Sequence, residues 1–87
     1  TVEASGEKHL PAVTVEDGAI HVNVGSVDHP MLPEHFIEWV YVQTENGGQR
    51  KVLKPGDEPH VTFSLGDDKA VAVYAYCTLH GLWKTEI

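Results

Sequence analysis

Apolar and polar residues alternate in short runs along most of this chain, which is typical of strands with one buried face. The alternation is strict at 19–24 and 61–65, where every second residue is apolar. The segment 35–44 is apolar on both faces, as expected for a central strand. No segment has a sustained helical period. The pattern predicts strands at 11–16, 19–24, 35–44, 49–53, 61–65, 70–77 and 82–86.

Turn signals separate these runs. Asp17-Gly18 is a strong two-residue hairpin signal, and Gly-, Pro- and Asp-rich stretches follow at 45–48, 54–59 and 66–68. About seven short strands at this spacing favour a sandwich of two sheets. The sequence therefore predicts an all-β fold.

Length and charge narrow the classes of function. The chain of 87 residues makes one small domain, with 1–6 expected as a linker or N-terminal arm and 7–87 as the folded unit. The net charge of −7 argues against a nucleic-acid partner. No apolar run reaches the ~20 residues of a membrane helix, and a single cysteine cannot form a disulfide within the chain. These features predict a cytoplasmic protein with no membrane partner.

The candidate chemistry lies in one cysteine and four histidines. Cys77 and His80 form a C-x-x-H motif, His29 and His35 form an H-x5-H motif, and His9 lies near the N-terminus. One thiolate and four imidazoles are too many ligands for a closed tetrahedral zinc site. They suit a redox transition metal that keeps one coordination position free.

Single histidines, cysteines and tryptophans also have simpler interpretations than metal binding. A lone histidine is usually a surface residue, and we interpret His21 and His60 in that way. A lone cysteine is more often a small buried hydrophobe than a ligand, and Trp39 and Trp83 are interpreted as packing residues. The two spacings together in one small domain nevertheless favour metal binding.

Several motifs, in the same order along the chain, resemble superoxide reductase of the desulfoferrodoxin and neelaredoxin group. They are Glu7-Lys8-His9, the stretch 25–31 with His29-Pro30-Met31, the stretch 35–39, Leu53-Lys54-Pro55-Gly56-Asp57, and the stretch 76–84 around Cys77 and His80. The resemblance implies an immunoglobulin-like sandwich that holds a mononuclear iron centre.

The same resemblance implies the ligand set. His9, His29 and His35 would bind through Nε2 and His80 through Nδ1 as equatorial ligands, and Cys77 would be the axial thiolate. The sixth position of ferrous iron would stay open. The implied reaction is one-electron reduction of superoxide, with two protons, to hydrogen peroxide.

Two further residues receive roles from the resemblance. Lys8 would steer anionic superoxide toward the site and orient a proton-donating water, and Glu7 would close onto ferric iron after turnover. Backbone N–H groups of Leu79 and His80 would point at the Cys77 sulfur. The chain departs from the family at Thr78, where asparagine is usual, which bears on tuning of the site.

The resemblance also implies partners. A rubredoxin-like protein would be the electron donor, a homo-oligomer (dimer or tetramer) is expected, and 1–6 resembles the junction to a rubredoxin-like domain. Two other classes stay open. A cupredoxin-like electron carrier would use a Cys/His copper site, but no methionine follows His80, since Met31 is the only one. The other is an immunoglobulin-like binding module without metal.

Overall fold

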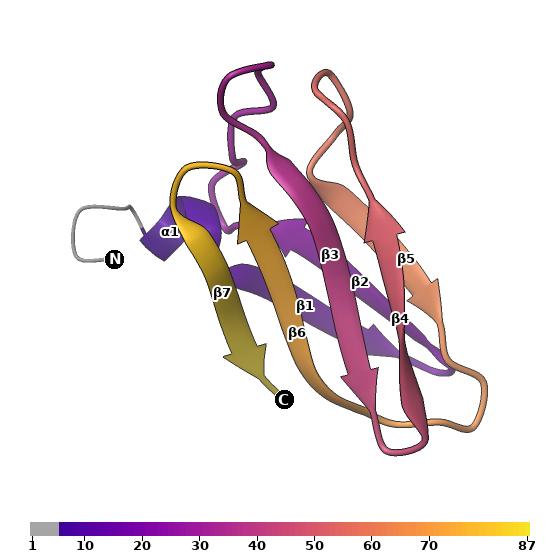
Figure 1. The fold of residues 1–87 in the computed structure, drawn as a ribbon. Helices are drawn as coiled ribbons and strands as arrows, with labels where there is room; N and C mark the ends of the chain where they lie inside the picture. Colours follow the sequence, from indigo (N-terminus) through magenta and orange to yellow (C-terminus); the bar gives the residue numbers. More distant parts are fainter. Residues whose placement is uncertain (1–5) are drawn as a thin grey trace.

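The chain folds into two antiparallel sheets that pack face to face (Figure 1). The structure, a computed structural model, describes residues 6–87, without the side chain of Glu7. Its elements are α1 (Gly6–His9), β1 (Pro11–Glu16), β2 (Ala19–Val24), β3 (Ile37–Thr44), β4 (Gly47–Val52), β5 (His60–Ser64), β6 (Ala70–Cys77) and β7 (Gly81–Glu86). The prediction of an all-β sandwich of about seven strands is confirmed.

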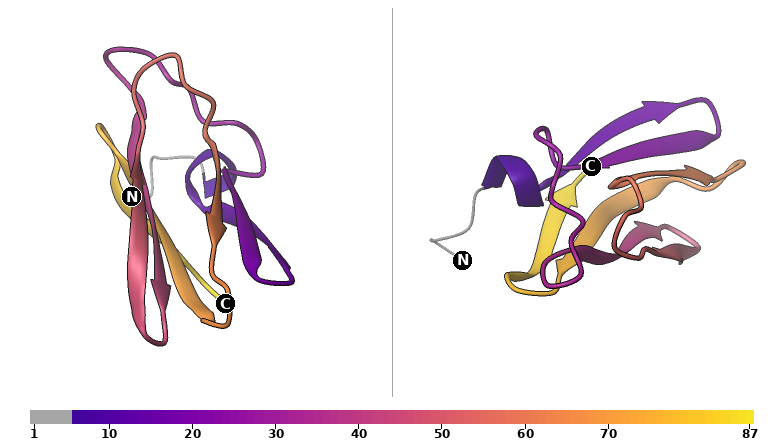
Figure 2. Two further views of the ribbon diagram at one scale, coloured as in Figure 1. Left: turned by 90° about the vertical axis from the view of Figure 1, so that its right-hand side faces the viewer. Right: turned by 90° about the horizontal axis from the view of Figure 1, so that it is seen from above.

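One sheet has the order β1-β2-β5 and the other the order β4-β3-β6-β7. The two layers are seen edge-on in the left view of Figure 2. The hairpin between β1 and β2 turns at Asp17-Gly18, where Gly18 has a φ of 70° that other residues rarely adopt. This turn was predicted from the sequence.

The core lies between the two inner faces and consists of the residues that the alternation placed there. Ile20, Val22 and Val24 of β2 are fully buried, while Asn23 between them is exposed. Phe63 of β5 lies beside Ile20 on the same inner face, Val40 of β3 belongs to the opposite sheet, and both are fully buried. Truncating Phe63 to alanine would cost about 3–5 kcal/mol of stability. This core makes a rigid base for the loops at one end.

The predicted start of the third strand was wrong. Strand β3 begins at Ile37 rather than at His35, because His35 closes a tight turn with Leu32 through two backbone hydrogen bonds of 2.9 Å. His35 therefore belongs to the loop between β2 and β3. In this loop position, the direction of the His35 side chain is not set by the alternation of a strand.

Other strand boundaries shift by one or two residues. Strand β4 begins at Gly47, since Glu45 and Asn46 alone make the turn. A side chain at Gly48 would overlap the Tyr41 hydroxyl, so this glycine makes room for the tyrosine ring on the outer face. Of the predicted linker 1–6, Gly6 already belongs to α1, and residues 1–5 lie outside the described part.

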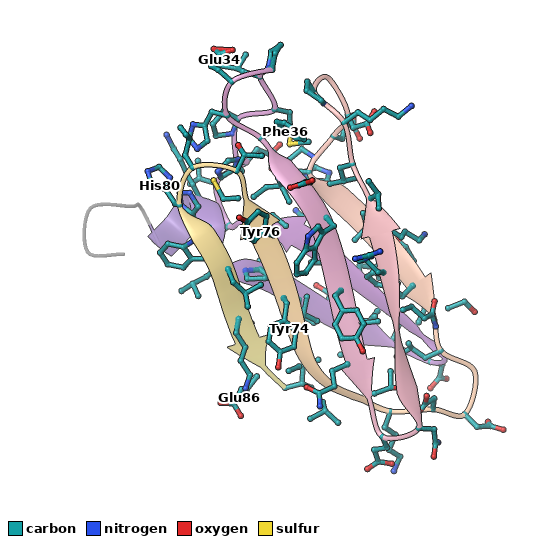
Figure 3. The ribbon with its side chains drawn as sticks, in the orientation of Figure 1. Glu34, Phe36, Tyr74, Tyr76, His80 and Glu86 are labelled. Carbon is teal, nitrogen blue, oxygen red and sulfur yellow. The ribbon has the colours of Figure 1, made fainter. Side chains whose placement is uncertain are left out.

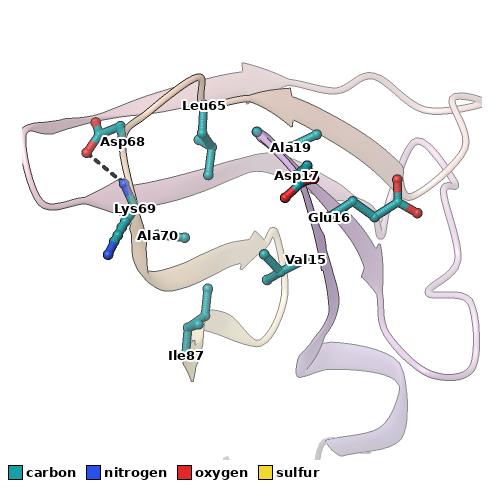
Figure 4. A pocket seen from close by; sticks show the side chains of 10 residues that line it. Val15, Glu16, Asp17, Ala19, Leu65, Asp68, Lys69, Ala70 and Ile87 are labelled. Atoms are coloured by element: carbon teal, nitrogen blue, oxygen red, sulfur yellow. Dashed lines mark hydrogen bonds between the residues drawn. The ribbon is translucent and has the colours of Figure 1, made fainter.

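A cavity of about 300 Å³ lies at the base of the sandwich. The apolar residues Val15, Leu65 and Ile87 and the charged residues Asp68 and Lys69 are among those that line it (Figure 4). It involves the β1–β2 turn and the start of β6, whereas the candidate ligands lie at the opposite ends of those strands. The cavity is therefore separate from the candidate metal centre. No helix in residues 6–87 is long and apolar enough to cross a membrane.

Candidate metal centre

The five predicted ligands lie at one end of the sandwich, on segments that are far apart in the sequence. His9 ends α1, and His29 and His35 lie in the loop between β2 and β3. Cys77 is the last residue of β6, and His80 follows in the turn to β7. Figure 3 shows His80 at this turn. The turn needs Gly81, whose φ of 79° is costly for other residues.

Short distances join specific atoms of these side chains. His9 Nε2 lies 3.1 Å from His29 Nε2 and 3.1 Å from His80 Nδ1. The Cys77 sulfur lies 3.3 Å from His29 Nε2. Ligand atoms of His9, His29, His35 and Cys77 all lie within 4.8 Å of one another, and His80 adjoins this group. The structure thus brings all five predicted ligands together.

The four imidazole rings are arranged as a square. Around its sides, the ring centroids are 4.6 Å apart for His9 and His29, 4.6 Å for His29 and His35, 5.2 Å for His35 and His80, and 4.9 Å for His80 and His9. Each neighbouring pair is nearly perpendicular. The diagonal from His9 to His35 is longer, at 6.3 Å, and these two rings are nearly parallel.

The thiol lies on one side of this square. Cys77 Sγ approaches His29 Nε2 to 3.3 Å and His80 Nδ1 to 3.8 Å, and these two histidines occupy opposite corners. A sulfur in contact with both ends of a diagonal lies over the middle of the square rather than at a corner. Cys77 is fully buried, so its sulfur lies on the core side of the cluster.

His29 is held in the tautomer that a metal ligand requires. Its Nδ1–H donates a 2.7 Å hydrogen bond to the carbonyl of Pro30, which leaves the lone pair on Nε2. Burial and, to a smaller extent, the neighbouring imidazoles lower the pKa of His29 to about 4, against the opposing effect of the Pro30 bond. The ring is therefore neutral at pH 7, with Nε2 directed into the cluster.

His35 contributes a further buried nitrogen to the cluster. His35 Nε2 is buried and has no hydrogen-bond partner in the structure. Desolvation lowers the pKa of His35, and the charges of His80 and Lys8 lower it further, against a raising effect of Glu34. A buried nitrogen lacking a partner is costly unless another group binds it. His35 therefore presents an unsatisfied buried nitrogen to the cluster.

Hydrogen bonds tie the ligand-bearing loops to one another. Thr78 N donates to the carbonyl of Phe36 at 3.0 Å, and the Thr78 hydroxyl accepts from Phe36 N at 3.2 Å. The C-x-x-H turn is thereby fixed to the residue that follows His35. His29 N donates to the carbonyl of Val24 at 2.8 Å, which fixes the start of the same loop to β2.

The two residues expected to assist the reaction lie in α1. Lys8 is exposed next to His9, and its charge reaches His35, whose pKa it lowers. The Glu7 side chain lies outside the described part of the structure, so its role as a cap on ferric iron stays a prediction. The expected N–H bonds from Leu79 and His80 to the Cys77 sulfur likewise stay a prediction.

The histidines interpreted as surface residues lie away from the cluster. His21 contacts Thr62 and Glu16 at 2.9 and 3.2 Å, and its side chain is 41% exposed. His60 pairs with Asp28 at 2.9 Å and is 39% exposed. The His60–Asp28 pair nevertheless anchors the residue before His29, a role that nothing in the local sequence signalled.

One residue interpreted as packing, Trp83, lies closer to the cluster than the sequence could show. Trp83 stacks on the His9 ring, with centroids 4.8 Å apart, while Trp39 stacks on Tyr76 on the outer face. The Met31 sulfur accepts a hydrogen bond from Ile37 N at 3.4 Å. Met31 therefore braces the start of β3 and does not point to a copper site. Their positions depend on strand pairing, which the local sequence did not signal.

Comparison with known proteins agrees with this geometry. A family model described as desulfoferrodoxin matches residues 1–86. The chain is similar to a desulfoferrodoxin homolog of Archaeoglobus fulgidus, with 45% identity over 98% of this chain and 67% of that protein. It is also similar to a superoxide reductase of Pyrococcus horikoshii, with 36% identity over 94% of this chain and 87% of that protein.

Solved structures give the same picture. The superoxide reductase from Treponema pallidum matches with a TM-score of 0.91 and 46% identity, covering 97% of this chain and 70% of that one. A one-iron superoxide reductase from Giardia intestinalis matches with a TM-score of 0.78 and 27% identity, covering 93% of this chain and 97% of that one. Both likenesses extend over the whole sandwich.

Proposed function

This chain belongs to the desulfoferrodoxin family, and on that premise we propose that it is a superoxide reductase with one mononuclear iron held by the His/Cys cluster. The observation that supports this most directly is the square of four imidazoles with a thiol sulfur on one side. Relatives and solved structures named superoxide reductase support the activity.

The donor atoms fit a single metal ion. Two nitrogens ~2.1 Å from a shared metal, at a right angle to each other, would lie about 3.0 Å apart. The distances from His9 Nε2 to His29 Nε2 and to His80 Nδ1 are both 3.1 Å. The partnerless His35 Nε2 is the kind of buried atom that a metal would satisfy. His9, His29, His35, His80 and Cys77 would therefore hold the iron.

The proposed reaction combines superoxide, one electron and two protons into hydrogen peroxide. When bound, iron would supply the electron by passing from the ferrous to the ferric state. The thiolate of Cys77 would donate electron density from the core side, which is how cysteine tunes other iron centres. The neutral imidazoles of His29 and His35 bind without adding negative charge, so an anionic substrate is not repelled by them.

Lys8 is proposed to bring superoxide to the site. The chain has a net charge of −7, which repels an anion at long range. The exposed ammonium of Lys8 lies next to His9 and within electrostatic reach of His35. It supplies local positive charge within the screening length of about 8 Å in physiological salt. The same ammonium is proposed to orient the water that donates a proton.

The oxidised site must regain an electron from another molecule after each turnover. We propose a small rubredoxin-like protein as the donor and a homo-oligomeric assembly, both from the family resemblance. Glu7 is proposed to cover the ferric site between turnovers, because a hard carboxylate prefers Fe³⁺ to Fe²⁺.

The test is metal analysis of protein purified without added metal, followed by rapid mixing of its reduced form with superoxide. One iron per chain, with stoichiometric oxidation and release of peroxide without dioxygen, is the expected result. Copper in place of iron, without that reaction, would instead support a cupredoxin-like carrier. Failure to bind any metal would support a binding module.

A further inference from the structure

His9 differs from the other candidate ligands in how its backbone is held. It ends α1, a single turn of four residues that precedes the first strand. Helices shorter than ~12–15 residues are marginal on their own in water. His29, His35, Cys77 and His80 lie in loops or strand ends anchored directly to the sheets. The position of His9 must therefore come from contacts with other parts of the fold.

Two such contacts come from the inward face of β7. The Trp83 ring stacks on the His9 imidazole, with centroids 4.8 Å apart and planes inclined by 28°. Two residues further along, the Thr85 hydroxyl donates a 2.7 Å hydrogen bond to the carbonyl of Pro11. Trp83 and Thr85 share one face of the strand because they are two residues apart. His9 and Pro11 thus contact the same face of β7, His9 through Trp83 and Pro11 through Thr85.

We propose that Trp83 and Thr85 are positioning residues that hold His9 at its corner of the metal-binding square. The inference rests on the proposed function only in taking His9 as a metal ligand. Trp83 acts through its ring face, because its Nε1 is buried and has no hydrogen-bond partner in the structure. Thr85 acts on the backbone, because its hydrogen bond fixes the carbonyl of Pro11, the first residue of β1.

The position of His9 matters because its Nε2 contacts two other corners. It lies 3.1 Å from both His29 Nε2 and His80 Nδ1, and the His9 side chain is only 3% exposed. Loss of the stacked Trp83 ring would let the His9 imidazole swing away while the other ligands stay in place. Residues that orient metal ligands typically change metal affinity 10- to 100-fold when they are removed.

The experiment measures how fast bound Co²⁺ passes to an excess of chelator, together with the Co²⁺ absorption spectrum. We expect Trp83→Leu to release Co²⁺ about 10- to 100-fold faster than the parent and to shift the spectrum toward fewer ligands. Trp83→Phe restores a ring and should release Co²⁺ at close to the parent rate. Trp39→Leu is the matched control, since Trp39 stacks on Tyr76 on the outer face.

Three outcomes with the tryptophan variants would overturn the proposal. They are parent-like release from Trp83→Leu, equal release from the leucine and phenylalanine variants, and equally fast release from Trp39→Leu. If Trp83→Leu does not fold, Thr85→Val replaces it in the experiment. We expect Thr85→Val to release Co²⁺ several-fold faster than the parent. Release at the parent rate would equally reject the positioning role. A parent chain that holds no Co²⁺ would also reject it.

This test is separate from the test of the reaction. Co²⁺ release is measured without superoxide, so it reports on His9 as a ligand and on the residues that hold it. Faster release from Trp83→Leu would stand even if the iron protein failed to reduce superoxide. In the converse case, an active iron protein with parent-like Co²⁺ release from Trp83→Leu would reject the positioning role alone.

Discussion

Acid should destabilise the metal-free protein well above the pH at which most carboxylates titrate, because of His29. Its pKa is lowered from 6.5 to about 4 in the folded protein, chiefly by burial. Between these two values the unfolded chain binds a proton at His29 and the folded chain does not. The contribution of this group to stability is therefore present above pH 6.5 and is lost as the pH falls toward 4.

The size of the effect follows from the shift. Each pH unit below 6.5 costs about 1.4 kcal/mol until the folded pKa is approached, so the loss between pH 7.5 and 5 is about 2 kcal/mol. A domain of this length has a free energy of unfolding of ~4–13 kcal/mol. Burial also lowers the pKa of His35, so its contribution has the same sign.

The assay is urea unfolding of chelator-treated protein at pH 5, 6 and 7.5, followed by tryptophan fluorescence. His29→Asn removes the titrating ring but keeps an N–H donor for the Pro30 carbonyl, and it should lose about 2 kcal/mol less than the parent over this range. His21→Asn removes a histidine outside the cluster and should keep the acid dependence of the parent. Parallel pH curves for the parent and His29→Asn would refute the reasoning.

Three further predictions concern the site. Lys8→Ala should lower the rate constant for the encounter with superoxide and weaken the dependence of that rate constant on ionic strength. Lys69→Ala, at the far end of the sandwich, should change neither. Equal rate constants for the parent and Lys8→Ala would reject the steering role. Cys77→Ser should abolish the thiolate charge-transfer band of the ferric protein, and an unchanged spectrum would remove Cys77 from the ligand set. Thr78→Val should release Co²⁺ faster than Thr78→Ser, because it loses the hydrogen bond to Phe36 N; equal rates would show that this bond does not fix the turn.

The sequence predicted the strands well where one face is buried and the other is wet. Residues 19–24 alternate strictly, and β2 has those bounds. The predicted start of β3 was wrong because no glycine or proline separates His35 from the apolar residues Phe36 and Ile37. Only the backbone bonds between Leu32 and His35 show that the chain is still turning there.

Which residues could make up a His/Cys cluster was visible in the sequence, but the geometry of the cluster was not. The C-x-x-H spacing places Cys77 and His80 together because a single turn joins them. The meeting of His9 with His80 depends on the pairing of β6 with β7 and on the contacts of His9 and Pro11 with β7. Such contacts between distant segments have no local signature, and for that reason the positioning by Trp83 was missed.

The approach of His9 to His80 has a consequence for how the protein is made. These residues are separated by 71 positions, nearly the full length of the chain. A metal bound to both would act as a cross-link around that loop and, by the chain-entropy relation for cross-links, would stabilise the fold by about 4 kcal/mol. During synthesis His9 cannot meet this partner until His80 has been translated, 71 residues later. Metal retention would therefore report that the two distant segments carrying His9 and His80 have reached their places.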